Sequence, residues 1–462
     1  MKDLKVRDII NVTGGKLIIG DEDLICKSYS KDTRQIKKDD TYIGIKGETF
    51  DGSAFWRQAF EKGASCVIVE NINLTNTEKE EFKGKTMILV DDTLEALYAI
   101  ARYKRSLYNI PVIAITGSVG KTSTKDLVAN VVSQKYKTLK TIGNYNNNIG
   151  LPFTILRMQE EEVMVLEMGM NHFGEISLLS SIAKPNICIV TNIGTSHIGN
   201  LGSRENILKA KLEILENAED PYIIINKDND LLNKWYEENK SNEKIITYGI
   251  KEKSNYSATE IKLNEEDSEF VAVINNKKEK IKVPVAGEHY ILNSLCACCV
   301  GKVLNIESDK IKEGIETFEL TQKRMTIREL KNGAKIINDA YNASPEAVCA
   351  SLKVLNQYKG NRKIAVLGDM FELGEYSKQL HEKVGKAVVE NNIDVLICSG
   401  ENAKSIVEKA IELGMNKNKV YYFEDKEKII TFLDEKSKEG DVILFKASNA
   451  MKFYELADRV KA

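Results

Sequence analysis

The sequence predicts an α/β protein built from three domains. Its 462 residues are about three times the length of one ordinary domain. Short apolar runs, typical of buried strands, alternate with segments of helical period along most of the chain. The pattern of these runs changes near residues 107 and 320, which divides the chain into three segments.

Composition and charge exclude several classes of protein. Lys and Arg total 66 against 68 Asp and Glu, so the net charge of −2 gives no positive excess for binding nucleic acid or an acidic membrane. Charged residues interrupt the apolar residues at the start of the chain, unlike a secretory signal. No stretch approaches the ~18 apolar residues that span a bilayer. We therefore expect a cytoplasmic monomer with no nucleic-acid partner and no membrane insertion.

The eight cysteines mostly lie in apolar segments, as small core residues do in a reducing compartment. Cys296 and Cys299 form a C-x-x-C pattern within a segment of helical character. No second pair completes a metal-binding set. We interpret both cysteines as core residues.

The first segment, residues 1–107, is predicted to form a small N-terminal α/β domain. Its β-rich runs are residues 41–45, 66–69 and 87–90, and its helical patterns cover residues 54–63 and 93–107.

The second segment, residues 108–319, carries longer apolar runs separated by helical stretches such as 204–218. These runs are residues 112–115, 163–166, 187–190 and 222–225. We expect them to be parallel strands covered by helices on both faces. Residues 256–285 alternate apolar and polar positions like a strand meander, and 288–304 is predicted to be a helix.

The third segment, residues 320–462, begins near Gln322 and repeats the alternation of strands and helices. Its strand signals lie at Ile336 and in residues 364–367, 395–398, 420–423 and 442–445. A second doubly wound, Rossmann-like sheet is therefore expected.

A glycine turn between a strand and a helix is the strongest chemical signal in the sequence. The turn consists of Gly117, Ser118, Val119, Gly120, Lys121, Thr122 and Ser123. In this geometry backbone N–H groups and the positive helix end face a phosphate, the lysine reaches the β/γ-phosphates and the threonine hydroxyl can bind Mg²⁺. The common spacing would place the first glycine at position 115, which is Ile115, so Gly117 takes the turn instead. The alternative is a surface turn with a chance lysine, which the flanking strand and helix disfavour.

Two residues downstream follow neighbouring predicted strands. Glu167 ends the run at 163–166, and His197 follows the run at 187–190. The carboxyl ends of parallel strands share one edge with the phosphate turn, so both side chains are candidate Mg²⁺ ligands. Magnesium prefers oxygen, so His197 could equally be a hydrogen-bonded residue at a strand end. Lys211 lies in a predicted helix, and the residues around it favour a charged side chain exposed to solvent.

Ten sequence blocks occur in order along the chain: Ser30–Arg34, Gly44–Gly52, Thr116–Thr122, Asn144–Pro152, Glu167–Asn171, Gly174–Ile176, Thr191–His197, Ala210–Ile214, Asp339–Pro345 and Gly368–Gly374. Together they resemble the Mur ligases, the ATP-dependent amide-forming family of peptidoglycan precursor synthesis. The last two blocks are similar to the branch of the family that adds D-alanyl-D-alanine. The resemblance implies a central P-loop ATPase-like domain between a substrate-binding first domain and a ligase domain.

The resemblance also implies roles for single residues. Ser30, Lys46 and Gly47 would lie near the UDP end of the substrate, with Asn146 and Asn147 also binding substrate. Asn293, Arg324 and Asp339 would contact adenine, phosphate and ribose. Thr122 would bind Mg²⁺, and Glu167 and His197 would bind a second Mg²⁺. Lys121, Lys211 and Arg324 would be catalytic, and Lys211 falls where several relatives carry a carbamylated lysine.

The implied reaction uses ATP and Mg²⁺ to convert the carboxylate of UDP-N-acetylmuramoyl-tripeptide to an acyl phosphate, which the amine of D-alanyl-D-alanine attacks. Two alternatives stay open. One is a paralogous ligase with another carboxylate and amine, such as a polyglutamate or storage-peptide synthetase. The other is a nucleotide-binding scaffold without turnover.

Three departures from the family pattern bear on substrate choice. Tyr290 stands in a Glu-His-Tyr sequence where the family has His-Asn, Asn449 replaces an arginine, and Ser53 replaces a histidine.

Overall fold

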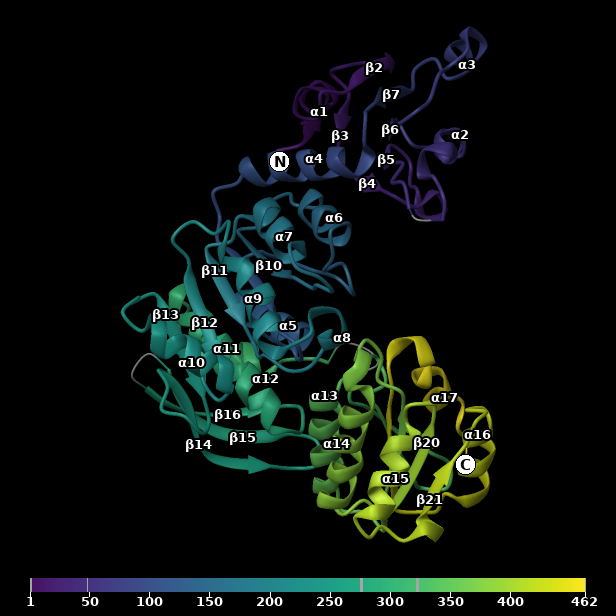
Figure 1. The fold of residues 1–462 in the computed structure, drawn as a ribbon. Coiled ribbons are helices and arrows are strands. Elements are labelled where there is room, and N and C mark those ends of the chain that lie inside the picture. Colours follow the sequence, from purple (N-terminus) through teal and green to yellow (C-terminus); the bar gives the residue numbers. More distant parts are fainter. Residues whose placement is uncertain (1, 48, 275–276, 321–323, 462) are drawn as a thin grey trace.

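The computed structural model describes residues 2–47, 49–274, 277–320 and 324–461. Each predicted segment of the chain forms its own main sheet, and these sheets follow one another along the molecule (Figure 1). The N-terminal segment also forms a small antiparallel sheet from residues 4–5 and 25–26. The three-domain α/β architecture predicted from the sequence is therefore confirmed. The predicted boundaries at 107/108 and 319/320 stay predictions, and the expected start of the third segment near Gln322 lies outside the described residues.

The N-terminal domain has a sheet of order β2-β7-β6-β5-β4, parallel except for β2. Its strands are β1 (Leu4–Lys5), β2 (Lys16–Ile19), β3 (Ile25–Cys26), β4 (Tyr29–Ser30), β5 (Thr41–Ile43), β6 (Cys66–Val69) and β7 (Thr86–Leu89). Its helices are α1 (Val6–Thr13), α2 (Trp56–Glu61), α3 (Asn76–Glu81) and α4 (Thr93–Ser106).

The central domain contains a nine-stranded sheet of order β16-β15-β14-β13-β12-β11-β8-β10-β9. Strands β8 to β14 are parallel, as predicted, and β14 to β16 form the expected antiparallel meander. The strands are β8 (Val112–Thr116), β9 (Thr138–Lys140), β10 (Val163–Glu167), β11 (Ile187–Val190), β12 (Tyr222–Asn226), β13 (Ile245–Gly249), β14 (Tyr256–Leu263), β15 (Ser268–Ile274) and β16 (Lys277–Val283).

Helices cover both faces of this sheet (Figure 1). They are α5 (Lys121–Val132), α6 (Gly150–Leu156), α7 (Glu175–Ala183), α8 (Ile198–Leu201), α9 (Arg204–Leu212), α10 (Asp230–Asn239), α11 (Glu288–Val303) and α12 (Ser308–Glu316). Cys296 and Cys299 are fully buried on α11, so their interpretation as core residues is confirmed. Within the described ranges no helix is long and apolar enough to cross a membrane.

The C-terminal domain has a sheet of order β17-β18-β22-β19-β20-β21, parallel except for β17. Its strands are β17 (Thr326–Glu329), β18 (Lys335–Asn338), β19 (Arg362–Gly368), β20 (Val395–Ser399), β21 (Val420–Tyr422) and β22 (Asp441–Lys446). Its helices are α13 (Pro345–Gln357), α14 (Ser377–Glu390), α15 (Lys404–Glu412), α16 (Lys428–Lys436) and α17 (Phe453–Arg459).

Apolar packing joins the domains. Phe153 and Leu156 of α6 are buried in the core that contains Leu97 and Ile100 of α4, so this helix links the first two domains. A second core runs from the central sheet to Leu352 of α13. The relative positions of the domains are therefore set by buried contacts.

Replacing Phe445 by alanine should destabilise the C-terminal domain. Phe445 is fully buried on β22, an inner strand of the sheet, so the truncation should cost about 3–5 kcal/mol. Calorimetry should show a lower thermal transition for Phe445→Ala. The control, Phe371→Ala, removes a ring that is 44% exposed and should leave the transition almost unchanged; equal losses in both variants would contradict this account.

Candidate active site

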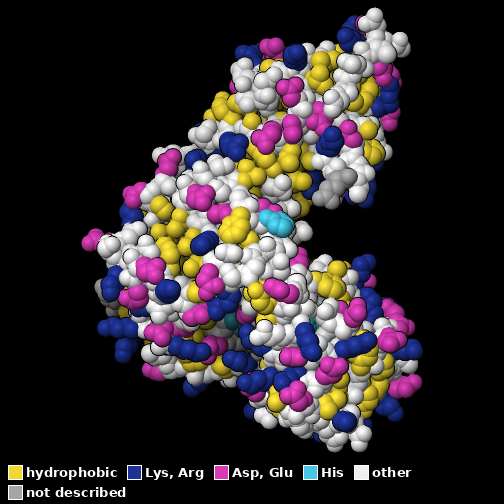
Figure 2. Space-filling view, in the orientation of Figure 1, with side chains coloured by type: hydrophobic (Ala, Val, Ile, Leu, Met, Phe, Trp, Pro, Cys, Tyr) yellow, Lys and Arg dark blue, Asp and Glu magenta, His cyan; other side chains and the backbone are white. Residues whose placement is uncertain are grey.

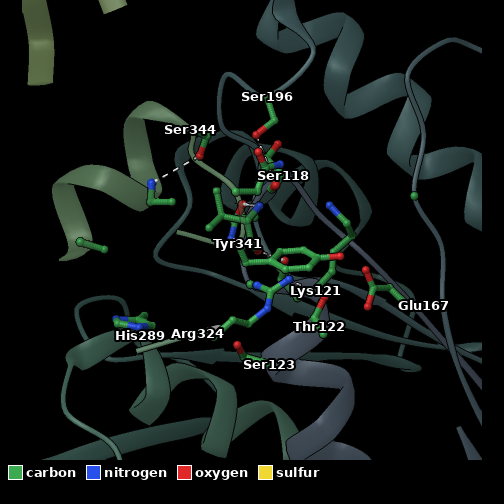
Figure 3. Close-up of a pocket in the computed structure, with 18 of the residues that line it drawn as sticks. Ser118, Lys121, Thr122, Ser123, Glu167, Ser196, His289, Arg324, Tyr341 and Ser344 are labelled. Atoms are coloured by element: carbon green, nitrogen blue, oxygen red, sulfur yellow. Dashed lines mark hydrogen bonds between the residues drawn. The ribbon is translucent and has the colours of Figure 1, made fainter. Parts of the chain in front are cut away.

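A cavity of about 450 Å³ lies between the central and C-terminal domains. Its walls include the turns that follow β8, β10 and β11 of one sheet, and the turn after β18 and the last residue of β22 in the other. The carboxyl ends of parallel strands are where α/β sheets bind ligands, and here two sheets contribute to one cavity. Figure 3 shows Lys121 and Thr122 from the central domain beside Arg324 and Tyr341 from the C-terminal side.

The glycine turn is held against the end of β11. Gly117 has φ +153°, and a Cβ on it would lie 1.9 Å from Thr191 Oγ1, so a side chain does not fit. Ser118 N donates to Asn192 O at 3.0 Å, and Val119 N donates to Asn192 Oδ1 at 2.9 Å. Sequence reasoning did not assign Thr191 and Asn192 a role, although both lie in a family block.

Helix α5 begins at the end of this turn. Gly120 is its N-cap with φ +81° and supplies no side-chain cap, which leaves first-turn N–H groups for an anion. Lys121 Nζ donates to Gly117 O at 2.7 Å. Burial lowers the pKa of Lys121, Glu167 opposes this shift, and the charge of Arg324 adds to it.

Arg324 reaches the phosphate turn from the C-terminal side. Its Nη2 donates to Thr122 Oγ1 at 3.0 Å, and its guanidinium lies 4.4 Å from the ring centroid of Tyr341 (Figure 3). Asn449 Nδ2 donates to Tyr341 O at 2.8 Å. Asn449, one of the departures from the family pattern, therefore supports the residue that stacks on Arg324.

Glu167 is 2% exposed at the end of β10. Its Oε1 accepts a hydrogen bond from Asn146 Nδ2 at 2.7 Å, whereas its Oε2 is buried without a hydrogen-bond partner. Asn147 Oδ1 accepts from Gly150 N at 2.8 Å, at the start of α6. Asn146, predicted to bind substrate, thus also orients Glu167, and one carboxylate oxygen remains for a ligand.

The expected adenine and ribose residues also line the cavity. Asn293 Oδ1 accepts from Thr124 Oγ1 at 3.0 Å, and its buried Nδ2 has no hydrogen-bond partner, so this donor is free to bind a ligand. Asp339 Oδ2 accepts from Ser351 Oγ at 2.6 Å and pairs with Lys446. Sequence reasoning did not single out Lys446, which lines the cavity and lies three residues before Asn449.

His289 and Tyr290 lie at the start of α11. Burial lowers the pKa of His289 to about 4, so its imidazole is uncharged at neutral pH. Tyr290, a departure from the family pattern, is 2% exposed, and its ring centroid lies 6.3 Å from that of Phe318. Tyr290 is thus a core residue at the edge of the cavity.

His197 lines the same cavity as Glu167. Its φ is +63°, and it precedes α8 as the N-cap residue. Its Nδ1 lies 2.6 Å from Oε2 of Glu372, which belongs to the C-terminal domain. Sequence reasoning did not single out Glu372. This contact with His197 holds the pKa of Glu372 below its usual value.

The interpretation of Lys211 as a solvated charge is wrong. Lys211 is 1% exposed, because α9 turns Ile207, Ala210 and Lys211 toward the core at helical spacing. Burial lowers its pKa well below the usual value, and the charge of Lys121 adds to that shift. Among the described residues its ammonium has no hydrogen-bond or ion-pair partner. The signal available in the sequence was its position on the apolar face of the helix.

The residues predicted to hold the UDP end do not line this cavity. Ser30 Oγ accepts from Asp32 N at 3.2 Å, and Gly47 N donates to Phe50 O at 2.9 Å. Lys46 forms an isolated bridge with Asp51. All three lie in the N-terminal domain, and the surface is hollowed between that domain and the C-terminal one (Figure 2).

Three family models match in succession along the chain. They are the Mur ligase family, catalytic domain, at residues 27–105, the Mur ligase middle domain at residues 115–301, and the Mur ligase, glutamate ligase domain, at residues 323–449.

Individual relatives match over nearly the whole chain. The UDP-N-acetylmuramoyl-tripeptide–D-alanyl-D-alanine ligase of Bacillus subtilis is 36% identical, with 94% of this chain and 93% of the relative covered. A crystal structure of MurF from Acinetobacter baumannii matches with a TM-score of 0.88 at 28% identity, covering 100% of this chain and 99% of that one. MurF ligase from Thermotoga maritima in complex with ADP matches with a TM-score of 0.81 at 29% identity, covering 94% and 97%. The chain belongs to the Mur ligase family.

Proposed function

We propose that this protein is a cytoplasmic ATP-dependent ligase that adds D-alanyl-D-alanine to the carboxyl end of UDP-N-acetylmuramoyl-tripeptide in peptidoglycan precursor synthesis. The observation that carries the proposal is one cavity in which Lys121 and Thr122 of the phosphate turn face Arg324 from the C-terminal side. Relatives that carry the name of this activity match more than nine-tenths of the chain.

The cationic side chains have a direct chemical purpose. A carboxylate is a poor acylating agent until one oxygen becomes a good leaving group, which transfer of the γ-phosphoryl group of ATP achieves. Lys121 and Arg324 neutralise charge on the transferring group, and the first turn of α5 holds the neighbouring phosphates. The acyl phosphate would hydrolyse in water, so the C-terminal domain shields it until the amine attacks.

The donor set fits magnesium. Glu167 offers a buried oxygen without a partner, Thr122 offers a hydroxyl, and His197 lines the same cavity. Within the described ranges no three His, Cys, Asp or Glu side chains form a metal cluster. This agrees with Mg²⁺, which usually takes few protein ligands and completes its shell with phosphate oxygens and water. When bound, the ion supplies positive charge to the phosphoryl oxygens.

Lys211 has the surroundings that a carbamate needs. CO₂ reacts with a neutral amine, and burial favours the neutral form of Lys211. The adduct replaces a cation that repels magnesium by an anionic oxygen ligand. We therefore propose that Lys211 acts as its carbamate.

The remaining roles extend this proposal to the other substrates. Ser30, Lys46 and Gly47 contact the UDP end of the muramoyl substrate, and Asn147 contributes to substrate binding. Asn293 binds the adenine through its free Nδ2, and Asp339 binds the ribose. Residues 1–107, 108–319 and 320–462 then act as the substrate-binding, ATP-binding and ligase domains.

The site argues against the scaffold but does not separate the two ligases. A scaffold that only binds nucleotide would use the half-buried Lys121 but would not need Lys211, whose burial is costly. A paralogous ligase would retain them, so only the substrates distinguish it. Folylpolyglutamate synthase of Mycobacterium tuberculosis, a structure with ADP, matches at 13% identity and shares the fold alone.

ADP release should require both UDP-N-acetylmuramoyl-tripeptide and D-alanyl-D-alanine. Lys121→Ala should lower turnover by about 10²–10³-fold, the usual cost of losing one preorganised charge. A coupled ADP-release assay over a panel of carboxylates and amines measures both effects. The control Lys137→Ala removes an exposed lysine and should leave turnover unchanged. Turnover with another substrate pair would identify a paralogue, and normal turnover of Lys121→Ala would refute the phosphate assignment.

Lys211→Met should stabilise the protein in buffer freed of CO₂. The native pKa of Lys211 lies below that of the unfolded chain, so its stability cost is largest below the native pKa and fades as pH rises toward about 10.4. We expect a gain of about 1–3 kcal/mol near pH 7, shrinking toward pH 10, in thermal melts. Lys209→Met, on the exposed face of the same helix, should show neither effect. A destabilised Lys211→Met protein would contradict the burial argument.

Lys211→Ala should lose turnover and regain part of it with short carboxylic acids. The cavity left by the side chain admits an acid whose oxygens replace those of the carbamate. Turnover measured with increasing acetate or propionate tests this. Full activity without added acid, or no recovery with any acid, would refute the carbamate role.

A further inference from the structure

Two residues with left-handed backbone meet across the boundary between the central and C-terminal domains. His197 has φ +63° and Glu372 has φ +64°. Nδ1 of the first lies 2.6 Å from Oε2 of the second, close enough for the two groups to pair, although the ring is not aligned for a hydrogen bond in this structure. Such conformations are unfavourable for residues with side chains and persist where the surrounding structure enforces them, often at functional sites. The contact is therefore built into both domains.

The backbone fixes where Glu372 sits on the central domain. Gly199 N donates to Glu372 O at 3.1 Å, and Tyr376 Oη donates to Gly202 O at 2.7 Å. A Cβ on Gly199 would lie 2.6 Å from Gly374 N, so the two backbone segments touch with no side chain between them. This approach brings the loop after β19 onto α8.

The same loop is rigidly held within the C-terminal domain. Met370 N donates to Nε2 of the fully buried His381 at 3.0 Å, and Phe371 N donates to Ser448 Oγ at 2.9 Å. Asp369 Oδ1 accepts from Ala403 N at 2.8 Å. Glu372 thus follows three anchored residues, and its carboxylate is presented from a fixed backbone.

We propose that Glu372 is a positioning residue that holds the His197 imidazole in the Nδ1–H form, with Nε2 left for the metal. A carboxylate on one ring nitrogen of a metal-binding histidine fixes its tautomer and ring orientation and raises the basicity of the other nitrogen. Magnesium binds nitrogen weakly, so its histidine ligand gains most from such support. This inference rests on the metal role of His197 in the proposed function.

The two halves of the arrangement belong to different domains. His197 comes from the central domain and Glu372 from the C-terminal domain, so the metal site is complete only when the loop after β19 is docked on α8. By linkage, metal binding then favours docking by the same factor by which docking favours metal binding. A contact that merely held the domains together would have no such effect on the metal.

The chain has only four histidines, so their imidazole spectra can be resolved and assigned. In the full-length protein labelled with ¹⁵N-histidine, His197→Ala identifies the signal of His197. We expect the Nδ1–H tautomer in the native protein and loss of this preference in Glu372→Gln. The matched control is Glu375→Gln, an exposed residue of the same loop, which should leave the signal unchanged. An Nε2–H tautomer in the native protein would overturn the inference.

Metal affinity is the second readout. Mn²⁺ alone, added to the labelled protein, should broaden the His197 signal, and Glu372→Gln should raise the concentration at half-broadening by about 10- to 100-fold. An unchanged midpoint in Glu372→Gln would overturn the inference and leave the metal role of His197 intact. If Mn²⁺ does not broaden His197 in the native protein, the metal role itself fails and the inference fails with it.

Gly199→Ala separates positioning from simple docking. The three atoms nearest to its Cβ belong to Glu372 and Gly374, so we expect the substitution to displace the loop first. We expect the same weakening of Mn²⁺ binding as in Glu372→Gln and no further loss in the double variant, because both act through one contact. Additive losses would overturn the inference.

Discussion

The concentration of positive charge between the central and C-terminal domains is the constraint on which the site depends. Burial and a neighbouring cation both lower the pKa of Lys121, and the same two causes act on Lys211. Arg324 is held beside the phosphate turn by its hydrogen bond to Thr122 and its contact with the ring of Tyr341. Lys121 and Arg324 line the cavity, and Lys211 is buried outside its lining but close enough for the charge of Lys121 to act on it. Cations that are partly removed from water cost free energy, which anions of matching shape offset. A nucleotide polyphosphate satisfies this electrostatic demand, so the arrangement favours ligand binding at some cost to the stability of the free protein.

The two parallel sheets explain how one cavity collects these groups. The phosphate turn, Glu167 and His197 follow adjacent strands of the central sheet, in the order set by β10, β8 and β11. Asp339 and Lys446 follow β18 and β22, which are neighbours in the C-terminal sheet. Since each sheet delivers residues only at its carboxyl edge, two such edges facing each other provide chemistry that neither domain holds alone.

Local patterns predicted the fold well because parallel strands are short apolar runs. Strands β8, β10, β11 and β12 were all expected, whereas β9 and β13 carry weaker signals and were not. The helix expected over 204–218 ends as a 3₁₀ turn at Leu215, after α9. The phosphate turn could be identified from its spacing between a strand and a helix.

The rest of the site could not be predicted from periodicity. Arg324, Asn293 and Asp339 were named only through the family resemblance, because their roles depend on how distant segments meet. The burial of Lys211 was not predicted, because its charge was given more weight than its position on the apolar face of the helix. Glu372 gains its contact with His197 only from domain docking, and Tyr341 meets Arg324 across a turn of the C-terminal domain; neither contact leaves a local signature.

The closeness of the domain contact bears on the proposed chemistry. An activated acyl group must meet an amine before it meets water, so the domains have to close in one arrangement rather than many. Long surface side chains would permit several such arrangements, because they adapt by changing rotamers. At Gly199 and Gly374 the backbones touch directly, with no room for a Cβ on Gly199. A domain contact of this kind holds His197, Arg324 and the phosphate turn in one arrangement. In-line phosphoryl transfer requires such a fixed arrangement.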